Sequence, residues 1–139
     1  MNFPVVTAIT GVALALLQTF LGFAVGFKRL KYNTGIGDGG HEALARKIRV
    51  HGNLTENAPI FLILLTFLEL AGTNRLTITI IGTIFVVSRI IHAYALDLTA
   101  STANPLRAVG NLGSNLSLII TAGMIVHQIL SGTYYQALP

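Results

Sequence analysis

Long apolar stretches separated by short polar segments dominate the pattern along the chain. No charged residue occurs between Met1 and Phe27, and none between Ile60 and Leu68. About 20 consecutive apolar residues are enough for a helix to cross a bilayer. The pattern therefore predicts four membrane-spanning helices, over residues 1–27, 41–71 and 76–96 and from residue 105 onward.

The second predicted helix begins with polar residues and becomes apolar without a break. Its polar side chains recur within roughly a 100° arc of a helix, and they are Glu42, Arg46, Arg49, Asn53, Glu56 and Asn57. A polar stripe that runs into a membrane-length helix is costly unless it lines a site or pairs with neighbouring helices. This stripe is the first candidate for a functional surface.

The third and fourth predicted helices carry polar residues of their own. Arg89 and His92 lie near the end of the third, and Pro105 is suited to the start of the fourth. One side of the fourth helix, within about 80°, holds Arg107, Asn111, Ser114, Leu118 and Thr121. The small residues there permit close approach of a neighbouring helix. Residues 98–104 are predicted as a loop, and Tyr134 and Tyr135 as an interfacial anchor.

Composition supports a single membrane domain over residues 1–139. The chain is 53% hydrophobic and 10% charged, whereas soluble domains average about 25% charged residues. The net charge of +4 comes without a basic patch on a soluble scaffold, which argues against nucleic acid as a partner. No cysteine occurs, so any thiol chemistry requires a ligand. The scattered histidines form no zinc motif, and no metal is expected.

Basic residues predict the orientation of the chain. The first loop and its flanks hold Lys28, Arg29, Lys31, Arg46, Lys47 and Arg49, whereas the turn between the second and third helices holds only Arg75. The positive-inside rule places the first and third loops in the cytoplasm and both termini outside. Arg49, Asn53, Glu56, Arg89 and Arg107 then gather at the cytoplasmic end of the bundle, where we expect one polar pocket.

Such a pocket suits a small anionic molecule with amide groups. Arginine binds carboxylates through paired hydrogen bonds, Glu56 can bind an ammonium group, and Asn53 can bind a peptide amide. Alternatives remain open at this point. Arg49 with Glu56, or Arg89 with Asp97, are candidate structural pairs, and the arginines can also contact the phosphates of membrane lipids.

The stretch RVHGNLTENAP, which contains Arg49, Asn53, Glu56 and Pro59, resembles the second-helix signature of the MAPEG family. This family comprises membrane-associated proteins in eicosanoid and glutathione metabolism, including microsomal glutathione transferases and leukotriene C4 synthase. The resemblance covers nearly the whole chain, and is greatest to the bacterial branch. It implies a homotrimer of four-helix protomers in the bacterial inner membrane, with glutathione held between subunits at the cytosolic side.

The resemblance also implies a role for individual residues. Arg49, Asn53 and Glu56 would bind glutathione, with His51 and Asn57 at neighbouring contact positions. Arg89 and His92 would form the wall of the site, and Lys28 and Arg29 would close it from the partner chain. Arg107 would stabilise the thiolate. The implied activity is a glutathione-dependent transfer to lipophilic electrophiles, or reduction of lipid hydroperoxides.

Some positions depart from the family pattern. Leu96 stands where some members have a tyrosine, and Tyr94 points about 160° away from that direction. Ala108 stands where the prostaglandin synthase of the family has a serine, which argues against that isomerase chemistry. Two functional classes therefore stay open: a glutathione-dependent enzyme, and a non-catalytic membrane protein that binds an anionic ligand or lipid. The enzyme requires Arg107 close to a bound thiol, whereas the binding protein requires only the Arg49–Glu56 face.

Overall fold

Four helices make up the fold, in a computed structural model that describes residues 3–98 and 104–132. They are α1 (Val5–Tyr32), α2 (Glu42–Leu70), α3 (Arg75–Leu98) and α4 (Pro105–Ser131), and each is long and apolar enough to cross a membrane. The prediction of an all-α bundle of four membrane-spanning helices is confirmed. Most of the predicted loop over 98–104, and Tyr134 and Tyr135, lie outside the described residues.

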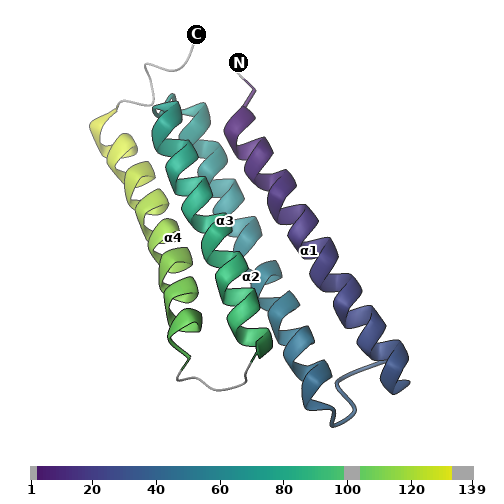
Figure 1. The fold of residues 1–139 in the computed structure, drawn as a ribbon. Helices are drawn as coiled ribbons and strands as arrows, with labels where there is room; N and C mark the ends of the chain where they lie inside the picture. The colour runs from purple at the N-terminus through teal and green to yellow at the C-terminus, as the bar shows by residue number, and fades with distance from the viewer. Residues whose placement is uncertain (1–2, 99–103, 133–139) are drawn as a thin grey trace.

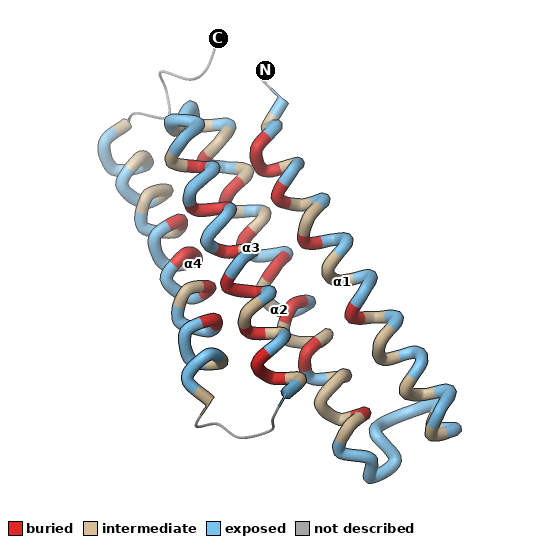
Figure 2. The backbone as a smooth tube through the Cα atoms, viewed as in Figure 1, coloured by how far each residue is buried: buried red, intermediate tan, exposed pale blue. Residues whose placement is uncertain are grey.

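The helices lie side by side, with α2 and α3 between α1 and α4 (Figure 1). The core forms where α1, α2 and α3 meet, and it contains Leu14, Leu54 and Leu65. At its centre the rings of Phe61 and Phe85 stack, with their centroids 3.7 Å apart. Outward-facing positions are mostly exposed in the single protomer (Figure 2). Many of them are large apolar residues, as expected of a surface that meets lipid or a neighbouring protomer.

Small residues bring α3 and α4 close together, as their spacing predicts. Gly110, Ser114, Ser117 and Thr121 are buried along one side of α4. A Cβ atom built on Gly110 would lie 2.6 Å from the backbone nitrogen of His92. Only glycine fits at this point, because the backbones of the two helices are in direct contact.

An ion pair and a tightly turned loop lie at the end of the bundle where the candidate residues gather. Lys47 Nζ on α2 lies 2.6 Å from Asp97 Oδ2 on α3. Within the described ranges Asp97 thus pairs with Lys47, and the alternative pair with Arg89 does not form. The α1–α2 connection turns through left-handed backbone at Asn33 and at Gly37, Gly39 and Gly40.

Candidate functional site

A polar cavity opens between α2, α3 and α4. It has a volume of about 340 Å³ and is lined by Arg49, Asn53, His92, Arg107, Ala108 and Asn111. Three helices contribute to it, so residues that are far apart in the sequence are brought together. None of the described residues that line it carries a carboxylate, whereas two carry a guanidinium group. The cavity is therefore suited to an anion with hydrogen-bonding groups.

The α2 side of the cavity is built from successive helical turns. Asn53 follows Arg49 by four residues and therefore lies on the same side of the helix. Its side-chain nitrogen donates to the carbonyl oxygen of Arg49 at 3.2 Å, and Asn57 donates in the same way to Asn53 at 2.7 Å. These bonds within the helix use one amide hydrogen each, so the side-chain oxygen of Asn53 remains available to a ligand.

A second cavity adjoins the first and shares Arg49 with it. It has a volume of about 350 Å³, and Gly37, Asp38, Ala45, Ile48, Gly52 and Glu56 complete its lining. Arg49 Nη1 lies 3.7 Å from Glu56 Oε1, and their side chains are 62% and 60% exposed. Such an exposed pair contributes little to stability. Each of the two groups can therefore give up the other and bind a ligand instead. The expected single pocket is thus two adjoining cavities, one cationic and one that contains acidic groups.

The start of α4 places Arg107 at the cavity. Asn104 caps this helix, since its side-chain oxygen accepts from the backbone nitrogen of Leu106 at 3.0 Å, and Pro105 occupies the first turn. Arg107 follows in that same turn, where helical N–H groups are unpaired and the helix dipole is positive. Its side chain and the helix terminus therefore both favour an anion. Asn111, one turn later, lines the cavity beside it.

Arg89 and His92 are both buried on α3. They are 3% and 5% exposed. His92 Nδ1 lies 3.3 Å from the carbonyl oxygen of Arg107, which joins α3 to the first turn of α4. Arg89 Nη2 and His92 Nε2 are both buried without a hydrogen-bond partner in the part of the chain that the structure describes. Only His92 of the two lines the cavity itself.

Six of the residues predicted for the site do not line this cavity in the protomer, namely Glu56, Asn57, Arg89, His51, Lys28 and Arg29. The last three lie on α1 or against it. His51 faces α1, where its Nε2 lies 2.8 Å from Gln18 Nε2. Lys28 lies over the ring of Tyr32, at 5.8 Å from the ring centroid. Arg29 Nη1 donates to the loop carbonyl oxygens of Thr34, Gly35 and Gly37 at 3.0–3.3 Å.

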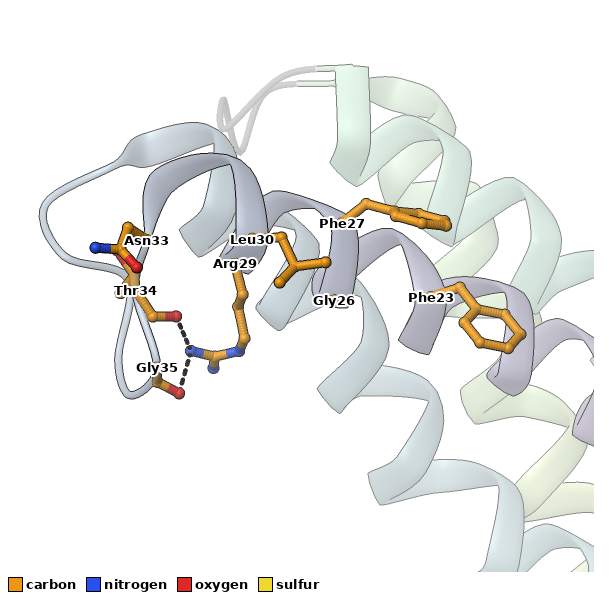
Figure 3. A pocket seen from close by; sticks show the side chains of 8 residues that line it. All are labelled: Phe23, Gly26, Phe27, Arg29, Leu30, Asn33, Thr34 and Gly35. Atoms are coloured by element: carbon orange, nitrogen blue, oxygen red, sulfur yellow. Dashed lines mark hydrogen bonds between the residues drawn. The ribbon is translucent and has the colours of Figure 1, made fainter.

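Arg29 thereby ties the α1–α2 loop to the end of α1. Beside it is a groove of about 460 Å³ lined by Phe23, Gly26, Phe27, Arg29, Leu30, Asn33, Thr34 and Gly35 (Figure 3). The groove is mainly apolar, and its guanidinium group is occupied by carbonyl oxygens (Figure 3). Within one protomer it is therefore less suited to a polar anion than the cavity at Arg49 and Arg107.

Asn111 is not among the predicted site residues, although it lies four positions after Arg107 and so shares its side of α4. That spacing is the signal that could have identified it. The ion pair between Lys47 and Asp97 has no comparable signal in the sequence, because it depends on how α2 and α3 are aligned along their lengths.

Comparisons with known proteins agree with this architecture. The family model of the MAPEG family matches residues 7–127. Two curated relatives, both called inner membrane protein YecN, come from Escherichia coli strains K12 and O6:H1. Each is 36% identical over 89 residues, which cover 64% of this chain and 68% of the relative. Because the family match reaches all four helices and includes every residue that lines the polar cavity, this chain belongs to the MAPEG family.

Proposed function

We propose that the protein binds glutathione in the polar cavity and uses its thiolate on lipophilic electrophiles or lipid hydroperoxides. One observation carries this proposal: Arg49 and Arg107, from α2 and α4, line one cavity together with Asn53 and Asn111. Glutathione offers two carboxylates, two peptide amides and an ammonium group. Arg49 matches a carboxylate, the asparagines match the amides, and Glu56 in the adjoining cavity matches the ammonium group.

The proposed role of Arg107 is to stabilise the thiolate. A free thiol with a pKa of about 8.5 is mostly protonated at neutral pH, and a nearby cation lowers that pKa. The thiolate adds to an electrophile by forming a carbon–sulfur bond. With a hydroperoxide, two glutathione molecules are oxidised to their disulfide, and the hydroperoxide is reduced to an alcohol and water.

The exposed charges of α2 support an assembly of protomers around this site. Glu56 lies near the middle of α2, and its side chain and that of Arg49 are 60% and 62% exposed in the protomer. Charged groups at that depth are costly when they face lipid. We therefore propose that neighbouring copies cover them, as in the implied homotrimer, and that the assembly resides in a bacterial inner membrane, as the names of the relatives suggest.

The test is the ultraviolet absorbance of thiolate when glutathione is added to the detergent-purified protein. We expect the parent protein to form thiolate. In Arg107→Ala the amount of thiolate should fall at least about tenfold, because a nearby cation shifts the pKa of the thiol by one unit or more. Arg107→Lys should retain part of the signal. Arg75→Ala, which removes an arginine at the other end of the bundle, is the matched control and should behave as the parent.

The outcomes separate the two functional classes. Thiolate that is lost in Arg107→Ala supports the enzyme. Glutathione binding without thiolate in the parent protein would favour a non-catalytic protein that holds an anionic ligand on the Arg49–Glu56 face. Absence of binding would overturn the assignment of glutathione.

A further inference from the structure

The hydrogen bond between His92 and Arg107 defines which ring nitrogen of His92 carries the proton. A carbonyl oxygen can only accept, so Nδ1, at 3.3 Å from the Arg107 oxygen, must be the donor. In a neutral imidazole the other nitrogen then has no hydrogen and offers a lone pair. His92 therefore presents Nε2 as an acceptor.

This acceptor has no partner of its own. His92 Nε2 is buried and makes no hydrogen bond to any residue in the described ranges, and the same holds for the donor Arg89 Nη2, one helical turn earlier. Buried polar atoms without partners are rare in native proteins. Of the two residues only His92 lines the cavity, and a ligand group that carries a hydrogen, such as a thiol, can donate to its Nε2.

Among the described residues that line the cavity, His92 is also the one whose side chain can accept a proton on a nitrogen lone pair. The guanidinium groups of Arg49 and Arg107 are donors only, Asn53 and Asn111 are not bases, and Ala108 has no ionisable group. Glu56 faces the adjoining cavity and lies against Arg49.

We propose that His92 Nε2 accepts the thiol proton of bound glutathione, and so acts as the general base of this site. The inference rests on the function proposed above, and adds the destination of the proton to it. The sulfur–hydrogen bond breaks, the proton moves to Nε2, and the sulfur keeps the electron pair beside the arginines. When the thiolate adds to an activated double bond, the carbanion formed at the neighbouring carbon takes the proton back from His92, which restores the neutral ring.

The experiment counts protons as well as thiolate. Glutathione is added to the detergent-purified protein in a weakly buffered solution with a pH indicator, near pH ~7.5. At this pH a free thiol, with a pKa of about 8.5, is mostly protonated, so each thiolate formed on the protein has given up a proton. The thiolate is measured in parallel by its ultraviolet absorbance. We expect the parent to form thiolate while releasing far less than one proton for each thiolate, because the negative charge of the thiolate beside His92 holds the transferred proton on the ring.

The diagnostic variant is His92→Asn. The asparagine amide nitrogen can replace Nδ1 as donor to the Arg107 carbonyl oxygen, whereas nothing replaces Nε2. We expect this variant to form at least about threefold less thiolate than the parent. For each thiolate that it still forms, close to one proton should be released into the solution. His127→Asn makes the same change on an exposed residue near the other end of α4 and should match the parent. Unfolding temperatures in the same detergent show whether the variants remain folded.

Each outcome is decisive. Thiolate with little proton release in the parent and full release in His92→Asn supports the inference. Full release by the parent would overturn it and leave the glutathione function standing, since Arg107 would then act with the solvent as acceptor. No thiolate in the parent would overturn both the enzyme and its general base.

Discussion

Gly110 is a residue at which the backbones of α3 and α4 are in direct contact, and its lack of a side chain permits the geometry of the cavity. The atoms that a Cβ would meet are the backbone nitrogen and Cα of His92, at 2.6 and 2.8 Å, and the carbonyl oxygen of Ser88 at 2.8 Å. All of them belong to the helix backbone and cannot rotate away. The distance between His92 and Arg107, on either side of the cavity, therefore depends on this glycine.

We predict that Gly110→Ala destabilises the protein by about 1–3 kcal/mol, because overpacking a helix contact forces backbone displacement. Thermal unfolding in detergent measures the effect. Gly123→Ala is the matched control on the same helix, since a Cβ added there would meet no atom of another helix within 4 Å. There the change should be neutral or stabilising, by up to ~1 kcal/mol. Equal unfolding temperatures for the two variants would contradict this account.

Periodicity predicted the candidate residues on α2 better than it predicted their partners. Arg49, Asn53 and Glu56 share one face, as their spacing requires, and Arg49 and Asn53 line the cavity. The bond between His51 and Gln18 depends instead on the alignment of α1 along α2. A helical period fixes the direction of a side chain about its own axis, but not which residue of the next helix lies at the same height.

At the scale of helices, the predicted spans and the observed helices differ mainly in where they end. The hydrophobic pattern predicts an uncharged span to Phe27 that Lys28, Arg29 and Lys31 close, and α1 continues through these residues to Tyr32. Lysine and arginine are good helix formers, and near a helix C-terminus they interact favourably with the dipole. The basic residues after Phe27 therefore mark the exit from the apolar region rather than the end of the helix.

The start of α1 depends on a side chain from another helix. Pro4 provides no side-chain cap. Instead, Glu69 near the end of α2 accepts hydrogen bonds from the backbone nitrogen atoms of Val6 and Thr7, at 2.9 and 2.7 Å, and from the Thr7 hydroxyl at 2.7 Å. The carboxylate satisfies N–H groups that a helix leaves unpaired and lies at the positive end of the dipole.

We predict that Glu69→Ala costs about 1–2 kcal/mol of stability and frays the first turn of α1, since an N-cap and a favourable dipole contact are both lost. Hydrogen exchange at Val6 and Thr7 should accelerate along with a lower unfolding temperature. Glu42→Ala removes a carboxylate of α2 that forms an exposed pair with Arg46, and should cost less than ~0.5 kcal/mol. Unchanged exchange at Val6 and Thr7 would show that Glu69 does not cap α1.

At the scale of the whole molecule, four helices in succession place the ends of the bundle on defined sides. The start of α1, the α2–α3 turn and the end of α4 lie at one end, and the α1–α2 loop lies at the other (Figure 1). The polar cavity lies toward the loop end, because Arg49 is in the first third of α2 and Arg107 in the first turn of α4. The orientation of the bundle thus decides which compartment supplies the polar ligand.

The positive-inside rule predicts that this end faces the cytoplasm, where a water-soluble thiol such as glutathione would enter. The chain contains no cysteine, so single cysteines can report the orientation without a background. We expect Ile36→Cys, in the α1–α2 loop, to be protected from a membrane-impermeant maleimide in intact cells and labelled after lysis. Arg75→Cys, at the other end, should be labelled in intact cells, and the parent should remain unlabelled throughout. The reverse pattern would place the cavity outside the cytoplasm and require a thiol that is available there.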